Sequence, residues 1–178
     1  MNRFWNEYQK AIADDHYFYE RSCIRQTFFP GSETAFLRML REELGKDIYD
    51  DFRQHTCTGI GYHTDVVPLE TTMTVVARLF SLMTEHGYEN YVPSCVTSFG
   101  VFTEMVHMWQ EHPELLEKTR ENLYKACKRE FNIPKNIAHP SDVIYHFRNE
   151  LAEKMKYRLV NRFTGRPLKV VEHIGCHY

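Results

Sequence analysis

Cysteines are the residues of this 178-residue chain whose type and spacing point most directly to chemistry. Cys23, Cys57 and Cys95 follow one another at similar intervals, each where a strand-like run meets a loop, and Cys176 lies close to the last residue. Thiols in this arrangement are typical of converging ligands, and thiolates are the groups that hold iron–sulfur clusters. The alternative is a set of buried structural thiols, because free cysteine is among the most buried residue types. Spacing alone leaves both interpretations open.

Two short segments read like ligand motifs from which one thiol is missing. Cys57-Thr58-Gly59 matches Cys-Cys-Gly with Thr58 in the second place, and Val92-Pro93-Ser94-Cys95 matches Cys-x-x-Cys with Val92 in the first. Neither a valine side chain nor a neutral hydroxyl replaces a thiolate as an iron ligand. Three thiolates can still hold a [4Fe-4S] cluster with one iron open to an outside ligand. The cofactor expected from the residues is therefore an iron–sulfur cluster with an incomplete ligand set.

Other polar residues near the cysteines are weaker candidates for the same site. The Thr58 hydroxyl could donate a hydrogen bond to a cluster sulfur, and His63 could do so or ligate iron, although a loop-fixing histidine is the simpler interpretation. His173 and His177 flank Cys176 and suggest zinc, but they are too close together in sequence for an ordinary tetrahedral site without distant partners. A small zinc domain that uses the first three cysteines is a third alternative.

Several further residues are expected to have ordinary structural roles. Cys127 falls in a helical pattern beside aromatic residues and is predicted to lie in the core. Glu33 is predicted to lie on an exposed helix face. Arg21 and Arg25 could lower the pKa of the Cys23 thiol or meet an anionic substrate, but solvated positions are the expected ones.

The hydrophobic pattern predicts alternating strands and helices that position these residues. The expected elements are a helix over 2–14, a strand over 17–19, a helix over 32–44, a weak strand over 48–55, a helix over 68–86, a strand over 88–92, helices over 98–111, 114–131 and 141–156, a turn over 161–167 and a strand over 169–174. This order predicts an α/β fold with a short, mostly parallel sheet flanked by helices. Functional groups in such folds gather beyond the carboxyl ends of the strands, which is where the cysteines are expected.

Composition limits the classes of function. The formal net charge of -2 gives no electrostatic footprint for nucleic acid, and no apolar stretch approaches the ~20 residues of a membrane-spanning helix. The five cysteines are an odd number, and no secretory signal is visible at the N-terminus. We therefore expect a cytoplasmic location and no disulfide framework.

The chain resembles the B subunit of heterodisulfide reductase, and within that family the Hdr-like B subunits of sulfur-oxidising prokaryotes. The likeness runs from about residue 17 to the end and is carried by Ser22-Cys23, Phe29-Pro30-Gly31-Ser32-Glu33, the stretch 57–68, Pro93-Ser94-Cys95 and the stretch 172–178. Family members carry two cysteine-rich modules, each with a lone Cys, a Cys-Cys-Gly and a Cys-x-x-Cys. With the N-terminal helix that the apolar spacing predicts taken as residues 1–15, the resemblance implies a first cysteine-rich module over 16–160 and the start of a truncated second module over 161–178.

The resemblance also implies a function and partners. It makes Cys23, Cys57 and Cys95 ligands of the first module and Cys176 the lone cysteine of the second. It implies an iron–sulfur redox subunit of a cytoplasmic complex, with a flavin-bearing A-type subunit and an iron–sulfur C-type subunit as partners. The implied substrate is a thiol or disulfide, with sulfur on a lipoyl carrier protein as one form. The alternative is an assembly or interaction subunit of the same complex that has no cluster.

Overall fold

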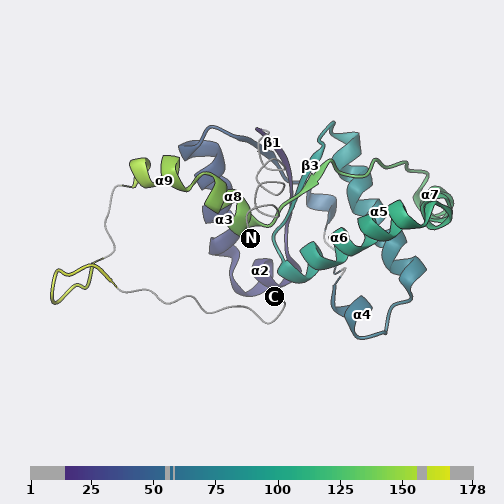
Figure 1. Ribbon diagram of the computed structural model, residues 1–178, viewed down its shortest axis with the longest axis horizontal. Coiled ribbons are helices and arrows are strands. Elements are labelled where there is room, and N and C mark those ends of the chain that lie inside the picture. Colours follow the sequence, from purple (N-terminus) through teal and green to yellow (C-terminus); the bar gives the residue numbers. More distant parts are fainter. Residues whose placement is uncertain (1–14, 55–56, 58, 156–159, 169–178) are drawn as a thin grey trace.

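A computed structural model of the chain describes residues 15–54, 57, 59–155 and 160–168. Its centre is a four-stranded sheet in which every strand pair is parallel, with the order β2-β1-β3-β4. The strands are β1 (His16–Glu20), β2 (Asp47–Tyr49), β3 (Asn90–Pro93) and β4 (Asn136–Ile137). Helices flank this sheet on both sides, so the predicted α/β fold is confirmed (Figure 1).

The two central strands are apolar on both faces because helices cover both faces. Phe18 pairs in register with Tyr91, and their rings stack with centroids 5.6 Å apart on one face of the sheet. Tyr19 pairs with Val92, and both side chains are buried on the other face. Alternation along each strand therefore divides the core into two clusters, one per face.

Three long helices pack on the face that carries Phe18 and Tyr91. They are α5 (Leu69–Glu85), α6 (Val96–Glu111) and α7 (Pro113–Cys127). The rings of Phe80 in α5 and Phe102 in α6 meet Tyr91 edge-on at 5.0 and 5.3 Å between centroids. The apolar spacing over 68–86 predicted α5 to within a residue at each end. The prediction for 114–131 was too long, because the chain turns at Lys128, whose φ of 55° is left-handed.

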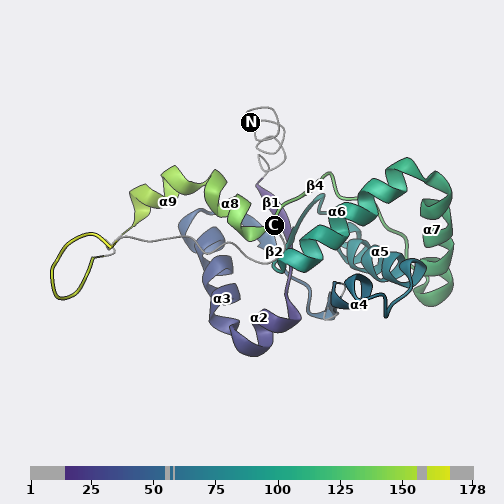
Figure 2. The ribbon, with the colours of Figure 1, turned by 60° about the horizontal axis from the view of Figure 1, so that its bottom comes forward.

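Shorter helices cover the opposite face (Figure 2). They are α3 (Pro30–Arg38) with a π-helical turn, η1 (Met39–Glu43), then α8 (Pro140–His146) and α9 (Arg148–Lys154). Phe36 of α3 packs on Tyr19 with ring centroids 5.4 Å apart. The single helix expected over 141–156 is two helices, because the chain turns at Phe147 between α8 and α9.

Helix α2 (Cys23–Phe28) and strand β4 are among the elements that were not predicted. Helix α2 begins directly after Ser22, whose hydroxyl accepts a hydrogen bond from the Arg25 amide at 3.3 Å. The two-residue strand β4 is too short to leave a pattern in the sequence. The helix expected over 2–14 and the strand expected over 169–174 lie outside the described residues. The expected turn is confirmed, with a bridge between Val160 and Pro167.

The residues after β2 form a charged junction rather than the longer strand predicted over 48–55. Asp51, which is 1% exposed, lies directly before a 3-10 turn, η2 (Phe52–Gln54), and ties the chain to His86 at the end of α5. Asp51 accepts hydrogen bonds from Arg53 Nε at 2.9 Å and lies 3.0 Å from His86 Nε2. No helix among the described residues combines the length and apolar character that crossing a membrane requires.

We expect Asp51 to make the stability of this junction pH-dependent. The hydrogen bonds from Arg53 hold the pKa of Asp51 well below its usual range. The contribution is therefore complete above the unfolded-state pKa of about 4 and is lost as the pH falls through the lower folded-state pKa. Asp51→Asn should lower the urea midpoint at pH 7 and flatten the fall in that midpoint between pH 5 and 2. Equal acid dependence in the two proteins would contradict this assignment.

Candidate functional site

The candidate site lies where the loops after β1 and β3 separate. β2 pairs with the outer edge of β1 and β4 with the outer edge of β3, so the chain leaves these two central strands in opposite directions. In parallel α/β sheets, a crevice forms beyond the carboxyl ends of the strands at such a switch point. Here the strand ladder extends into the loop, because the Ser94 amide donates to the Glu20 carbonyl at 3.0 Å.

Three thiols line one cavity of about 350 Å³ at this point. Cys23 is the first residue of α2 and Cys95 caps the N-terminus of α6, so they follow β1 and β3 directly. Cys57 reaches the cavity from the loop after β2. Cys23 and Cys57 are exposed and Cys95 is partly buried, so the cavity is open to solvent. The structure thus gathers the first three predicted cysteines around one space.

The thiols influence one another electrostatically. Burial raises the pKa of Cys23, and the neighbouring Cys57 raises it further, with a smaller effect from Cys95. Each effect favours the neutral thiol, because thiolates at close range repel one another. A cavity of this kind holds several thiolates together only when a cation offsets their charge.

Glu20 lines the same cavity and was not foreseen from the sequence. It is 1% exposed, and its Oε2 atom has no hydrogen-bond partner among the described residues. Burial raises the pKa of this carboxyl well above its usual range, and the nearby Cys95, Glu33 and Cys57 raise it further. The one signal in the sequence was a charged residue closing a strand of three aromatic residues.

Glu33 joins the two loops that carry Cys23 and Cys95. Its Oε1 atom accepts a hydrogen bond from the Ser22 amide at 2.8 Å and another from the Ser94 hydroxyl at 2.9 Å. Glu33 is 2% exposed, so the prediction of an exposed helix face was wrong for this residue. Its spacing from the buried residues Phe36, Leu37 and Leu40 places it on the inner face of the helix, and that spacing could have revealed it.

Removing the Glu33 acceptor should destabilise the protein. Glu33→Ala leaves the Ser22 amide and the Ser94 hydroxyl unpaired in a buried setting, which costs about 1–3 kcal/mol for each such group. We therefore expect a clearly lower free energy of unfolding, measured with urea at pH 7. Glu33→Gln keeps a carbonyl acceptor and should recover most of the loss. Equal stability of the Ala and Gln variants would show that these hydrogen bonds contribute nothing.

Close packing limits which side chains fit at Gly59, which lines the cavity, and at Gly61. A Cβ atom on Gly59 would come 2.3 Å from Thr97 Cγ2, and one on Gly61 would come 2.6 Å from Val67 Cγ2. A side chain at either position would clash with these methyl groups. The close approach of the neighbouring side chain, and not an unusual φ, therefore favours glycine at both positions. Helix α4 (Ile60–His63) follows at once and brings exposed Ile60 and His63 to the cavity.

Thr58, Cys176 and Cys127 are the remaining residues singled out in the sequence. Thr58 and Cys176 fall outside the described residues, so their proposed roles stay predictions. Cys127 is exposed at the end of α7, which corrects the expectation that it lies in the core. Within the described parts of the chain, no three His, Cys, Asp or Glu side chains are arranged around a single metal ion.

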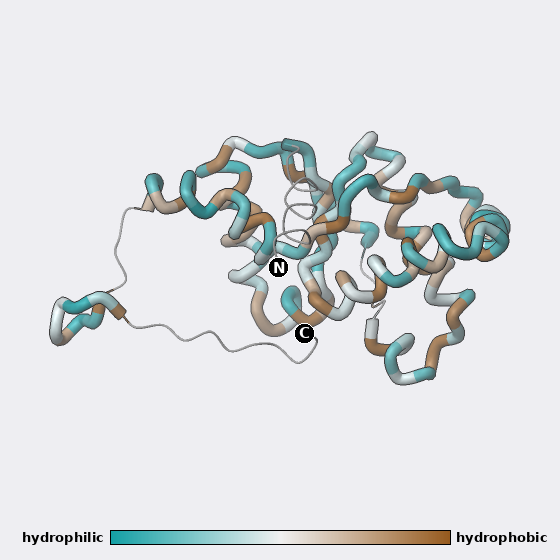
Figure 3. The backbone as a smooth tube through the Cα atoms, viewed as in Figure 1, coloured by the Kyte–Doolittle hydropathy of each residue, from teal (hydrophilic) through white to brown (hydrophobic). Residues whose placement is uncertain are grey.

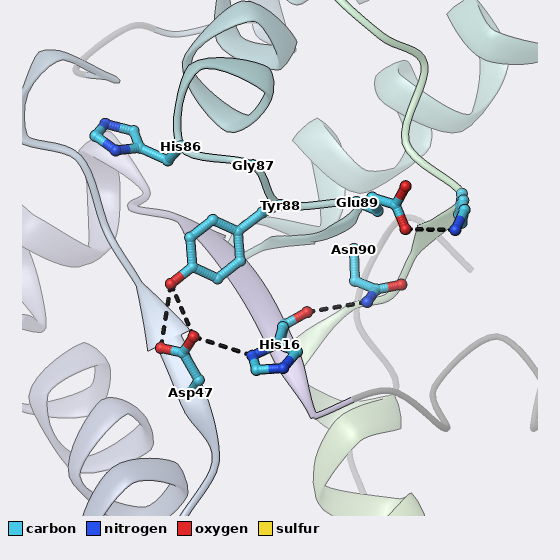
Figure 4. Close-up of a pocket in the computed structure, with 8 residues that line it drawn as sticks. His16, Asp47, His86, Gly87, Tyr88, Glu89 and Asn90 are labelled. Atoms are coloured by element: carbon cyan, nitrogen blue, oxygen red, sulfur yellow. Dashed lines mark hydrogen bonds and ion pairs between the residues drawn. The ribbon is translucent and has the colours of Figure 1, made fainter.

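A second cavity, of about 500 Å³, lies at the amino ends of the strands and has different chemistry (Figure 4). There Asp47 lies 3.0 Å from His16 Nδ1 and accepts a hydrogen bond from the Tyr88 hydroxyl at 3.0 Å. Asn90 donates to the His16 carbonyl at 2.9 Å. Burial, and then the bond to Asp47, raise the pKa of Tyr88 to about 12. These contacts tie together the amino ends of β1, β2 and β3, and the cavity contains no cysteine among its lining residues.

The fold and the cavity together define an α/β protein with thiols at the switch point of a parallel sheet. Over 170 residues, 95% of its length, the chain is 28% identical to the B subunit of ferredoxin:CoB-CoM heterodisulfide reductase from Methanosarcina acetivorans. This confirms the resemblance seen in the sequence: the chain is a distant relative of the heterodisulfide reductase B subunit. It spans about half of that relative, 54% of its length.

Two further comparisons bear on family and fold. No family model matches the chain. A solved structure, that of a hypothetical protein from Helicobacter pylori, superposes with a TM-score of 0.56 at 12% identity, covering 80% of this chain and 30% of that one. At this identity the likeness supports the fold alone.

Proposed function

We propose that the chain is a redox subunit of a heterodisulfide-reductase-like complex and that Cys23, Cys57 and Cys95 hold an iron–sulfur cluster. The observation that carries this proposal is the placement of three thiols around one cavity at the switch point, in a distant relative of the heterodisulfide reductase B subunit. When bound, the cluster would supply one-electron transfer to or from a sulfur substrate.

The donor set is the kind that an iron–sulfur cluster uses. Thiolate is the ligand of such clusters, and three thiols share this cavity. The repulsion that raises the pKa of Cys23 is the kind that a cationic iron centre relieves.

Val92 and Thr58 distinguish this site from the pattern of the family. Val92 is fully buried in the core on the Tyr19 side of the sheet and is not among the cavity-lining residues. The described ligand set is therefore three thiols, and a [4Fe-4S] cluster held by them keeps one iron for an outside ligand. His63 lines the cavity and could hydrogen-bond the cluster or supply that ligand.

The proposed partners follow from the name of the relative and from the resemblance. They are an A-type flavin subunit, a C-type iron–sulfur subunit and a lipoyl carrier protein that delivers sulfur. Exposed apolar side chains at the end of α2, the helix that begins with Cys23, support docking of a partner, because Phe28 is 71% and Phe29 63% exposed. Figure 3 shows this corner between α2 and α3 in brown, against the mainly teal outer helix α7.

The same corner favours a second candidate, an interaction subunit that has kept the fold and binds no cluster. Helix α2 buries none of its own residues, as expected for a surface that another subunit covers. The two candidates predict different contents of the purified protein: iron and sulfide for the redox subunit, and neither for the interaction subunit.

Iron and acid-labile sulfide analysis after anaerobic purification tests the proposed function. We expect a brown protein with both elements present and a paramagnetic signal in one redox state. Cys57→Ala should lose at least half of the iron, because two thiolates hold a cluster poorly. Cys127→Ala is the matched control, since that thiol is exposed on α7 and does not line the cavity, and it should keep the full content. A colourless wild-type protein, or equal loss in both variants, would rule out the cluster and favour the interaction subunit.

A further inference from the structure

A short hairpin that follows α9 in the chain presents an aromatic ring to solvent. Residues 160–168 form this turn, which we call the Phe163 hairpin, and an antiparallel bridge between Val160 and Pro167 closes it. The side chain of Phe163 is 94% exposed. Figure 1 shows the hairpin in yellow beyond the end of α9, apart from the sheet. An apolar ring exposed to this degree gains free energy when another surface covers it.

The hairpin is held in shape by its own hydrogen bonds. The side chain of Asn161 accepts from the Phe163 and Thr164 amides at 2.9 and 3.0 Å. The Asn161 amide donates to the Arg166 carbonyl at 2.8 Å, and the Gly165 amide donates to the carbonyl of Asn161 at 2.8 Å. Gly165 has a left-handed φ of 65°, which glycine adopts without strain. Because the turn is preformed, little conformational entropy is lost when a partner covers the ring.

The hairpin is also a centre of positive charge. Arg162 and Arg166 are both exposed, and residues 160–168 include no aspartate or glutamate. The sequence between Glu153 and Glu172 has six lysine and arginine residues and no acidic one, although acidic residues outnumber basic ones by 24 to 22 in the whole chain. Such segregation of charge is typical of a segment that meets an anionic surface.

Exposed aliphatic side chains accompany these arginines. Val160 and Leu168, at the two ends of the hairpin, are 44% and 46% exposed, and Met155 at the end of α9 is 60% exposed. Nucleic acid would pair with the arginines and stack on Phe163, but it would leave the aliphatic side chains in water. The interfacial region of a bilayer suits both kinds of residue, because anionic headgroups meet the cations while acyl chains cover the apolar side chains.

The size of the hairpin favours a lipid surface over a protein partner. A stable protein interface takes about 800 Å² and about 20–30 residues from each partner, whereas this hairpin has nine residues. Lipid binding instead adds up over individual cations and inserted apolar side chains, so it needs no minimum area of contact.

We propose that the Phe163 hairpin binds anionic lipid headgroups at a membrane surface. Phe163 enters the boundary between headgroups and acyl chains, and Arg162 and Arg166 contact the lipid phosphates. The inference goes beyond the proposed function and does not involve the thiol cavity. It adds a peripheral contact with a membrane, made by a preformed turn.

Co-sedimentation of the full chain with lipid vesicles tests this inference. Vesicles of phosphatidylcholine with about 30% phosphatidylglycerol provide the anionic surface, and vesicles of phosphatidylcholine alone are the neutral comparison. We expect binding to the anionic vesicles in about 0.1 M NaCl. Binding should be about tenfold weaker or more with the neutral vesicles, and also in about 0.5 M NaCl, because salt screens the contacts with the headgroups.

Two sets of substitutions separate the contributions of charge and ring. Arg162→Gln combined with Arg166→Gln should weaken binding to the anionic vesicles about 30-fold, since each cation near such a surface contributes about fivefold. Phe163→Ser should weaken it about tenfold, because the inserted ring is lost.

Matched control variants change exposed residues of the same types on other elements. Arg38→Gln combined with Arg120→Gln removes two arginines whose side chains are 68% and 51% exposed, and Phe52→Ser removes a phenylalanine that is 79% exposed. Each control should bind the anionic vesicles within about threefold of the wild type, because the remaining charge effect is weak at a distance.

Equal binding to the two kinds of vesicle would overturn the inference, as would equal losses in the hairpin variants and their controls. It would also be overturned if the chain bound poly(U) RNA or polyglutamate and not the anionic vesicles, since the hairpin would then belong to a site for nucleic acid or for an acidic protein. The iron and sulfide analysis is independent of these results, because residues 160–168 include no cysteine.

Discussion

The site depends on one buried carboxylate that joins two loops. Glu33 of α3 accepts from the Ser22 amide and the Ser94 hydroxyl, the residues directly before Cys23 and Cys95. One backbone hydrogen bond, from the Ser94 amide to the Glu20 carbonyl, continues the strand pairing past β3, and the loops then leave in opposite directions. A hydrogen-bond acceptor shared by the two loops provides a further restraint, and its burial makes the restraint strong because water cannot replace it.

The amino ends and the carboxyl ends of the strands differ in how far their polar groups are satisfied. At the amino edge, His16, Asp47, Tyr88 and Asn90 satisfy one another and tie three strands together. At the carboxyl edge, polar groups remain without partners among the described residues, and thiols face a cavity with apolar side chains at its mouth. Satisfied polar networks stabilise a fold, whereas a buried unpaired acid beside thiols is a cost that a binding function explains.

The relation to the B subunit of heterodisulfide reductase accounts for the cysteines that share the cavity, and it makes the missing cysteines of the two motifs recognisable. The chain spans about half of its relative and carries three thiols in the described site. Where the resemblance implies a further cysteine, Val92 contributes to the core between β3 and the α3–α8 side. The described cavity therefore brings together three thiols, fewer than the resemblance implies.

Several features of the fold could be predicted from local patterns in the sequence. Period-3.6 apolar spacing defined α5, a run of aromatic residues defined β1, and the alternation of elements was sufficient for the α/β class, because these signals depend on neighbours in sequence. Cys23 and Cys95 could be assigned to strand ends for the same reason, whereas Cys57 lies in the loop after β2, beyond the 3-10 turn η2, and not directly at a strand end. The hydrogen-bond partners of Glu33, the exposure of Cys127, the split of α8 from α9 and the ion pair of Arg21 with Asp50 were decided by the tertiary structure. Each of these depends on which element packs against another, and a charged residue on a helix looks the same in sequence whether it meets water or two hydrogen-bond donors from distant loops.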